Sequence, residues 1–133
     1  MSGRAAPRLI RLGLPLWLAL LAGCGGQADS AAFSCDRDPP LSYDNFGEGF
    51  LSTHCEGCHS VLNPAGLREG APLEAHFSSY ADVLAWAERI EARSIDPAAG
   101  MPPGGGPSED ERQLLHEWLV CDVFPAQDAM EAP

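Results

Sequence analysis

Three stretches of the chain show the apolar spacing of an amphipathic helix, and none shows a convincing strand alternation. The first covers residues 43–58, in which Phe46 and Phe50 lie four positions apart. The second covers residues 79–93 and the third residues 108–121, each with apolar side chains on one helical face. The pattern therefore predicts an all-α fold with three main helices.

The predicted helices carry local signals for their starts and contacts. Ser79 is a typical N-cap for the second helix, and Ser108 with Glu111 forms an S-x-x-E capping box for the third. In the first helix, Gly47 and Gly49 lower the helix propensity. We interpret these two glycines as positions where another helix approaches closely.

Two long stretches between the helices are rich in glycine and proline. They cover residues 60–78 and 95–107, and neither shows a helical or strand pattern. Loops of this length are uncommon in a small domain, and so short a chain buries limited apolar area. We therefore expect the loops to wrap a large apolar cofactor that completes the core.

The N-terminus has the layout of a secretory signal peptide. Residues 1–11 contain three arginines and no acid, and residues 12–23 are almost entirely apolar. This run is shorter than the roughly 20 residues that span a membrane. Leu21-Ala22-Gly23-Cys24 then resembles the lipobox of bacterial lipoproteins. The resemblance implies that Cys24 carries the lipid and anchors the protein in the bacterial cell envelope, facing the periplasm, at the inner or the outer membrane.

The rest of the chain is strongly acidic. From Cys24 onward it has five arginines and no lysine against nineteen acids, a net charge near −14. Such a surface repels nucleic acid and favours a basic protein partner, although solubility alone would also explain it.

Cys55-Glu56-Gly57-Cys58-His59 forms the C-x-x-C-H motif of covalent haem attachment. On a helix the two thiols and the histidine share one face, so the thiols can reach the haem vinyl groups while His59 reaches the iron. A structural zinc site and a redox dithiol are the alternatives. Zinc usually needs a second ligand pair, and a dithiol usually follows a strand, and the sequence shows neither.

Met101 lies in the second Gly/Pro-rich loop and is the best-placed second ligand for haem iron, because its soft thioether suits iron and raises the reduction potential. A methionine that only fills core space is the simpler alternative. The rival ligands are His54, His76 and His116, of which the loop residue His76 is the strongest.

The odd cysteine count resolves once lipid and haem are assigned. Cys24 takes the lipid, and Cys55 and Cys58 take the haem, which leaves Cys35 and Cys121. In an oxidising compartment this last pair is expected to form a disulfide.

With these motifs in place, residues 43–120 resemble a class I cytochrome c domain. The sequence Leu114-Leu115-x-x-Trp118-Leu119 is similar to the C-terminal helix of that family, and Phe46, Gly47 and Phe50 are similar to the face of its first helix that crosses the last one. The resemblance implies a small cytochrome c-like fold around one haem c.

The resemblance also suggests partners around the haem. In the family a backbone carbonyl accepts the second N–H of the ligand histidine, and here Pro72 or Pro64 would supply it to His59. Arg68 would either pair with a haem propionate or lie in solvent as a loop arginine.

These observations divide the chain into four parts. Residues 1–23 form the signal peptide, and residues 24–40 form a lipid-anchored tether that leads into the fold. Residues 41–124 form the cytochrome c domain, and residues 125–133 form a flexible C-terminal tail.

Ligation by His59 and Met101 would leave no open iron position, so the sequence predicts a monohaem electron carrier rather than an enzyme. It would work alone or as a subunit of a larger oxidoreductase, with a redox protein as its partner. The alternative is a haem enzyme subunit or gas sensor with a labile sixth ligand. A third hypothesis is a lipid-tethered interaction module without haem, in which Cys55 and Cys58 form a disulfide.

Overall fold

The computed structural model describes residues 33–132, and its regular elements are all helical, with no strand in that range. The expected all-α class is therefore confirmed for this part of the chain. The predicted signal peptide, the lipidation residue Cys24 and most of the tether lie outside the described residues. Within them, no helix combines the length and apolar character needed to cross a membrane.

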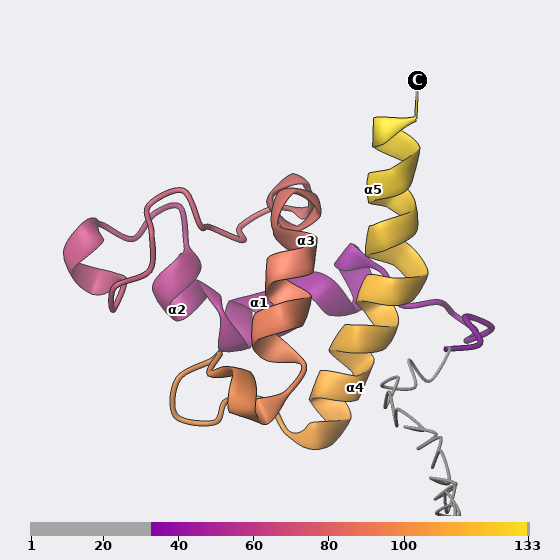
Figure 1. The fold of residues 1–133 in the computed structure, drawn as a ribbon, viewed down its shortest axis with the longest axis horizontal. Coiled ribbons are helices and arrows are strands. Elements are labelled where there is room, and N and C mark those ends of the chain that lie inside the picture. Colours follow the sequence, from indigo (N-terminus) through magenta and orange to yellow (C-terminus); the bar gives the residue numbers. More distant parts are fainter. Residues whose placement is uncertain (1–32, 133) are drawn as a thin grey trace, which may run out of the picture. The chain divides into compact units, whose positions relative to one another are not determined.

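Figure 1 shows the order of the elements along the chain. They are a π-helical turn Tyr43–Gly47, α1 Glu48–His54, α2 Glu56–His59, a 3-10 turn Ala65–Leu67, α3 Tyr80–Ser94, a 3-10 turn Pro97–Ala99, α4 Glu109–Trp118, a π-helical turn Leu119–Val123 and α5 Phe124–Glu131.

The starts of α3 and α4 agree with the capping signals in the sequence. The Ser79 side chain caps α3 by accepting a hydrogen bond from the backbone N–H of Asp82. Ser108 and Glu111 form both halves of a capping box at α4. These bonds satisfy N–H groups that have no partner inside the helix.

The core lies where α1, α3 and the rod formed by α4, the following π turn and α5 meet. Helix α3 buries one face, and α4 with the following π turn buries another. The fully or almost fully buried side chains of these elements are Val83, Leu84, Ala87, Ile90, Leu115, Trp118, Leu119 and Val123. Each of the larger of these side chains contributes about 1.5–3 kcal/mol on burial.

Gly47 lies directly against the Trp118 ring of α4. A Cβ atom added there would lie 2.5 Å from two ring carbons of Trp118, whereas one added at Gly49 would meet nothing within 4 Å. The interpretation of these glycines as contact positions is therefore confirmed for Gly47 and wrong for Gly49.

The first predicted helix is broken rather than continuous. It was expected over residues 43–58, but α1 ends at His54, and Cys55 leaves the helical conformation with φ −120° before α2 begins. The break goes with a change of environment, because the Cys55 side chain packs against the core. The Asn63 amide then ends α2 by donating to the carbonyls of Glu56 and Gly57 at 3.0 and 2.9 Å.

The predicted flexible C-terminal tail is wrong for residues 125–131, which belong to helix α5. Pro125 cannot donate a backbone hydrogen bond and crowds the preceding turn. The π turn before it has wider i→i−5 bonds, such as Phe124 N–H to the Leu119 carbonyl, and accommodates the proline. Gln127 then donates to the Leu84 carbonyl at 3.2 Å and holds α5 against α3.

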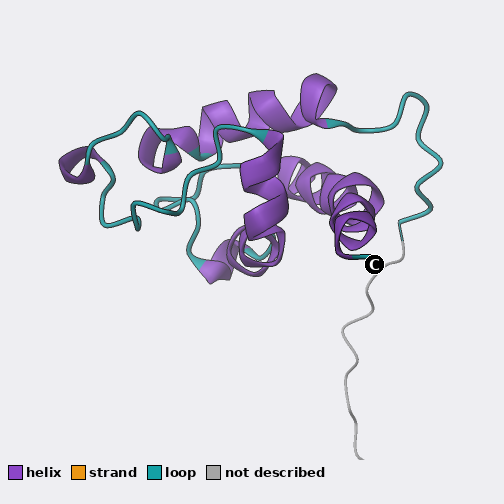
Figure 2. Cartoon of the chain, turned by 90° about the horizontal axis from the view of Figure 1, so that it is seen from above, coloured by secondary structure: helices purple, strands orange, loops and turns teal. Residues whose placement is uncertain are grey.

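The N-terminal segment of the described range is attached to α4 and the π turn that follows it, and Figure 2 shows the helices from above. A disulfide joins Cys35 to Cys121, with their Cα atoms 5.5 Å apart. The Arg37 guanidinium also donates two hydrogen bonds to the Glu117 carboxylate, at 2.6 and 2.7 Å. Both links join segments more than 75 residues apart in sequence, at separations of 86 and 80.

Candidate functional site

The C-x-x-C-H motif forms a single helical turn. The backbone N–H groups of Cys58 and His59 both donate to the Cys55 carbonyl, at 3.1 and 2.9 Å. The turn gives the three residues the i, i+3, i+4 spacing that favours a common helical face, and the Cys55 side chain also packs against the core. Cys55 and Cys58 are free thiols of intermediate burial, in contrast to the bonded pair at Cys35 and Cys121.

The segment that precedes α3 makes two contacts with the His59 ring and one with the His59 backbone. Its Nδ1 lies 2.8 Å from the carbonyl oxygen of Ala75, and its ring stacks on Phe77 with centroids 4.5 Å apart. The His59 carbonyl accepts from the Phe77 backbone N–H at 2.9 Å. Because a carbonyl can only accept, Nδ1 is the protonated nitrogen of the neutral ring, and Nε2 is then the nitrogen with the lone pair. Among the described residues Nε2 has no hydrogen-bond partner, so it is available to a metal.

The carbonyl that accepts from His59 is not one of the two expected from the family resemblance. Pro72 and Pro64 were the predicted acceptors, whereas Ala75 makes the bond. The Pro72 carbonyl instead accepts from Arg68 at 2.6 Å. The loop therefore reaches the His59 ring later in the sequence than expected. Before it does so, its backbone forms two turns, in which the Ala71 N–H donates to the Arg68 carbonyl and the Ala75 N–H donates to the Pro72 carbonyl.

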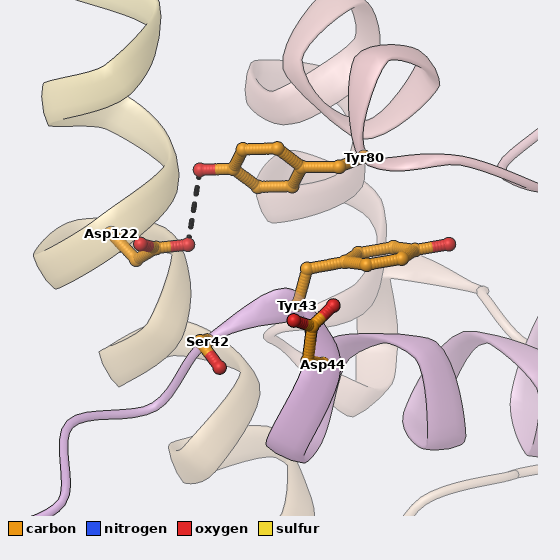
Figure 3. A pocket seen from close by; sticks show the side chains of 5 residues that line it. All are labelled: Ser42, Tyr43, Asp44, Tyr80 and Asp122. Carbon is orange, nitrogen blue, oxygen red and sulfur yellow. Dashed lines mark hydrogen bonds between the residues drawn. The ribbon is translucent and has the colours of Figure 1, made fainter.

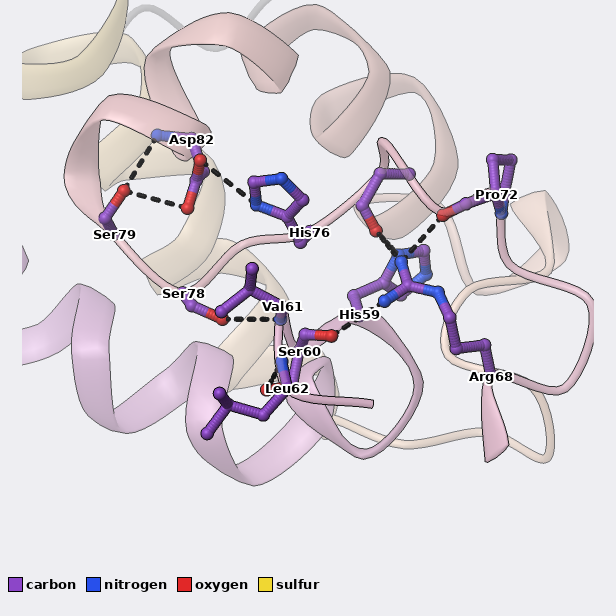
Figure 4. A network of polar contacts seen from close by, with 11 residues as sticks. His59, Ser60, Val61, Leu62, Arg68, Pro72, His76, Ser78, Ser79 and Asp82 are labelled. Atoms are coloured by element: carbon purple, nitrogen blue, oxygen red, sulfur yellow. Dashed lines mark hydrogen bonds and ion pairs between the residues drawn. The ribbon is translucent and has the colours of Figure 1, made fainter. Parts of the chain in front are cut away.

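The buried side chain of Arg68 holds the loop of residues 60–78 together through hydrogen bonds (Figure 4). Its side chain is only 1% exposed, so the interpretation as a solvated loop arginine is wrong. All three guanidinium nitrogens donate to backbone carbonyls, namely those of Ser60 at 2.7 Å, Ala71 at 3.3 Å, Pro72 at 2.6 Å and Ala75 at 2.6 Å. The planar fork of arginine suits this arrangement, because one rigid group can satisfy several carbonyls at once.

A second buried arginine holds the loop that carries Met101. The Met101 backbone N–H donates to the Arg93 carbonyl at 3.0 Å, and its carbonyl accepts from Arg112 Nη1 at 3.1 Å. Arg112 is 4% exposed and also donates to the carbonyls of Ser94 and Gly105. The Met101 backbone is therefore fixed on both sides, and its side chain is half-buried.

In Figure 1 the loop of residues 60–78 lies beside α2, on the side away from α5, whereas the loop of residues 95–107 runs from the end of α3 to the start of α4. Five large apolar side chains are exposed in the described range, and four of them belong to the loop after the motif. These four are Val61, Leu62, Leu67 and Leu73, between 57% and 87% exposed. An apolar group bound beside this loop would cover surface that is unfavourable in water.

The three rival histidines each have a carboxylate beside one ring nitrogen. The pairs are His54 with Glu111 at 3.3 Å, His76 with Asp82 at 3.1 Å and His116 with Glu91 at 3.2 Å. Burial raises the pKa of Asp82, but the hydrogen bonds from Ser79 and the neighbouring His76 ring outweigh burial and leave that pKa below its usual value. Each contact occupies one ring nitrogen, as the Ala75 carbonyl does at His59, so these contacts hold the rings in place and the three histidines stay rival ligands.

The Cys55 thiol is not an activated nucleophile. Burial, with a smaller contribution from the Glu56 charge, raises its pKa to about 12. Dithiol oxidoreductases need the opposite shift, because the thiolate is the reactive form.

A separate pocket of about 270 Å³ contains none of the predicted site residues (Figure 3). It is lined by Ser42, Tyr43, Asp44, Tyr80 and Asp122. The Asp122 carboxylate accepts from the Tyr80 hydroxyl at 3.0 Å and from the Trp118 indole N–H at 2.9 Å. Burial and the bond to Asp122 raise the pKa of Tyr80 to about 12. The two hydrogen bonds to Asp122 join the start of α3 to the end of α4 and the π turn after it.

Three residues that shape the site were not identified from the sequence in these roles. Arg112 had a usable signal, because it lies three residues before the buried Leu115 and so on the apolar face of α4. Arg68 had no such signal, since it lies in an irregular loop. The Ala75 carbonyl had none either, because every residue has a backbone carbonyl.

Comparison with known proteins gives no match: neither a protein-family model, nor a curated protein, nor a solved structure matches this chain. Within residues 33–132, no three His, Cys, Asp or Glu side chains gather in a way that could hold a metal ion.

Proposed function

We propose that this chain is a monohaem c-type cytochrome that transfers electrons, with haem attached through Cys55 and Cys58. The observation that carries the proposal is the state of His59, whose Nδ1 is bound to the Ala75 carbonyl while Nε2 keeps a free lone pair. Ligand histidines in metal sites are typically held in this way, because the bond at one nitrogen fixes the tautomer and raises the basicity of the other.

The surrounding residues fit the group. Cys55 and Cys58 are unbonded and lie on the same helical turn as His59. The exposed leucines of the next loop would gain an apolar partner, and haem would add to the apolar area that this small domain buries. Haem would contribute a one-electron redox change, while the protein determines ligation and environment.

The fold supports the same assignment. The π turn before α1 packs against α4 through Gly47 and Trp118. The C-x-x-C-H turn follows directly after α1. We propose on this basis that residues 41–124 have a cytochrome c-like fold, extended by α5.

Met101 is the proposed second ligand. Hydrogen bonds from and to its backbone hold it, and buried Arg112 braces the loop around it. Such bracing favours a thioether that stays bound, and two filled axial positions favour outer-sphere electron transfer over catalysis. The net charge near −14 from Cys24 onward favours a basic redox protein as partner. The lipobox-like sequence at Cys24 would tether the domain in the periplasm.

The proposal is tested by visible spectra of the full chain expressed with the haem c maturation machinery. A sharp low-spin reduced spectrum, unaffected by carbon monoxide, supports an electron carrier with two protein ligands. A high-spin spectrum that shifts with carbon monoxide would favour the gas sensor or enzyme subunit instead. A chain without haem, or one with a Cys55–Cys58 disulfide, would contradict the proposal altogether.

A further inference from the structure

The carbonyl oxygen of Ala75 accepts hydrogen bonds from two side chains at once. His59 donates through Nδ1 at 2.8 Å, and Arg68 donates through Nη2 at 2.6 Å. Ala75 is 4% exposed and Arg68 1% exposed, so little water reaches either bond. One buried oxygen therefore connects a guanidinium group to the histidine of the C-x-x-C-H motif.

The charge on Arg68 has no counter-ion in residues 33–132, where the ion pairs involve other residues. Burying an uncompensated charge is costly, and only its hydrogen bonds to carbonyls offset that cost. A neutral amide has two N–H groups and can hold two carbonyls, as Asn63 does for Glu56 and Gly57. Arg68 holds four carbonyls, and it also places a full positive charge beside the motif.

We propose that Arg68 is a positioning residue that raises the reduction potential of the haem by weakening the hydrogen bond from His59 to Ala75. This inference rests on the proposed function. A cation that already draws electron density from the Ala75 oxygen makes that oxygen a poorer acceptor for the second donor. His59 then gives less electron density to the iron than it would with an unshared carbonyl partner.

The direct effect of the charge has the same sign. Reduction adds one electron from the redox partner and removes one positive charge at the iron, with no bond formed or broken. A buried guanidinium nearby disfavours the more positive, oxidised form, and low-dielectric surroundings strengthen this effect. Both routes lead to a higher potential with Arg68 than without it.

The test compares three variants of the haem-loaded full chain by redox titration. Arg68→Gln removes the charge but keeps a hydrogen-bonding side chain, and Arg68→Lys keeps the charge but loses the planar fork. Arg89→Gln is the matched control, because Arg89 is exposed on α3 and loses the same charge. We expect Arg68→Gln to shift the reduction equilibrium at least about tenfold toward the oxidised form, which is ~59 mV for a one-electron couple.

A second readout separates positioning from plain structural support. In the reduced protein, the NMR resonance of the His59 Nδ1 proton should move downfield in Arg68→Gln, because the bond to Ala75 becomes stronger. Arg68→Lys should lie closer to the wild type than to Arg68→Gln in potential, even if its melting temperature falls as far.

The outcomes are distinct for the two proposals. If Arg68→Gln and Arg89→Gln have the same potential, or if both Arg68 variants shift equally with no change at the His59 proton, Arg68 only supports the loop and the inference is overturned. The proposed function would stand in that case. A wild-type chain that takes up no haem overturns both.

Discussion

Replacing Gly47 by alanine probes the helix crossing on which the fold depends. The backbone at Gly47 is right-handed helical, with φ −58° and ψ −51°, so alanine causes no backbone strain. Its Cβ would, however, lie 2.5 Å from two ring carbons of Trp118, about 1 Å inside an ordinary carbon contact of about 3.5–4.0 Å. The Trp118 ring is fully buried, and its N–H is bonded to Asp122 at 2.9 Å, so the ring cannot swing away.

The magnitude follows from two opposing effects. Overpacking a filled core costs about 1–3 kcal/mol, and two rigid ring atoms place this case at the upper end. The better helix propensity of alanine offsets about 0.5–1 kcal/mol of that cost. We therefore expect Gly47→Ala to lower the stability by about 2 kcal/mol, a fall in melting temperature of roughly 8–16 °C for a domain of this size.

Gly49→Ala is the matched control, because its Cβ meets nothing within 4 Å. It should leave the melting temperature unchanged or raise it by a few degrees. Thermal unfolding of the haem-loaded proteins, followed by far-ultraviolet circular dichroism, provides the comparison. If Gly47→Ala melts at or above the temperature of Gly49→Ala, the close packing of Gly47 on Trp118 is refuted.

Three further predictions concern the proposed site and its supports. Met101→Ala should lower the reduction potential and let carbon monoxide bind the reduced protein; an unchanged potential would remove Met101 from the ligands. Arg112→Gln should leave buried carbonyls unpaired and so lower the melting temperature. It should also loosen the Met101 loop and speed carbon monoxide binding, and equal binding rates would show that Arg112 does not brace the ligand. Joint replacement of Cys35 and Cys121 by serine should lower the free energy of unfolding by up to about 4–5 kcal/mol, since the bridge closes a separation of 86 residues, and an unchanged denaturation midpoint would speak against a stabilising bridge.

Features set by neighbours in the sequence were predictable. The caps at Ser79 and Ser108 depend on residues three positions away, and both α3 and α4 begin where those signals lie. The single turn from Cys55 to His59 likewise follows from helical spacing. The Cys35–Cys121 bridge joins residues far apart in sequence. It was predictable because the other three cysteines already had proposed roles.

Features set by contacts across the fold were not predictable from the sequence. The break at Cys55 accompanies packing of that side chain against the core, and α5 depends on a π turn that accommodates Pro125. The burial of Arg68 depends on four carbonyls brought together by a folded loop. No periodicity records such contacts, because an irregular backbone presents its carbonyls according to tertiary structure alone.

The central claim is that Cys55 and Cys58 hold a haem. Its most direct test is the mass of the full chain after expression with the haem c maturation machinery, measured on protein that has been reduced and acid-denatured. The account predicts a mass increase of one haem, located on the peptide that contains Cys55 and Cys58 and lost when both are replaced by serine. A chain with the mass of the polypeptide alone, and with both thiols open to alkylation, would contradict it.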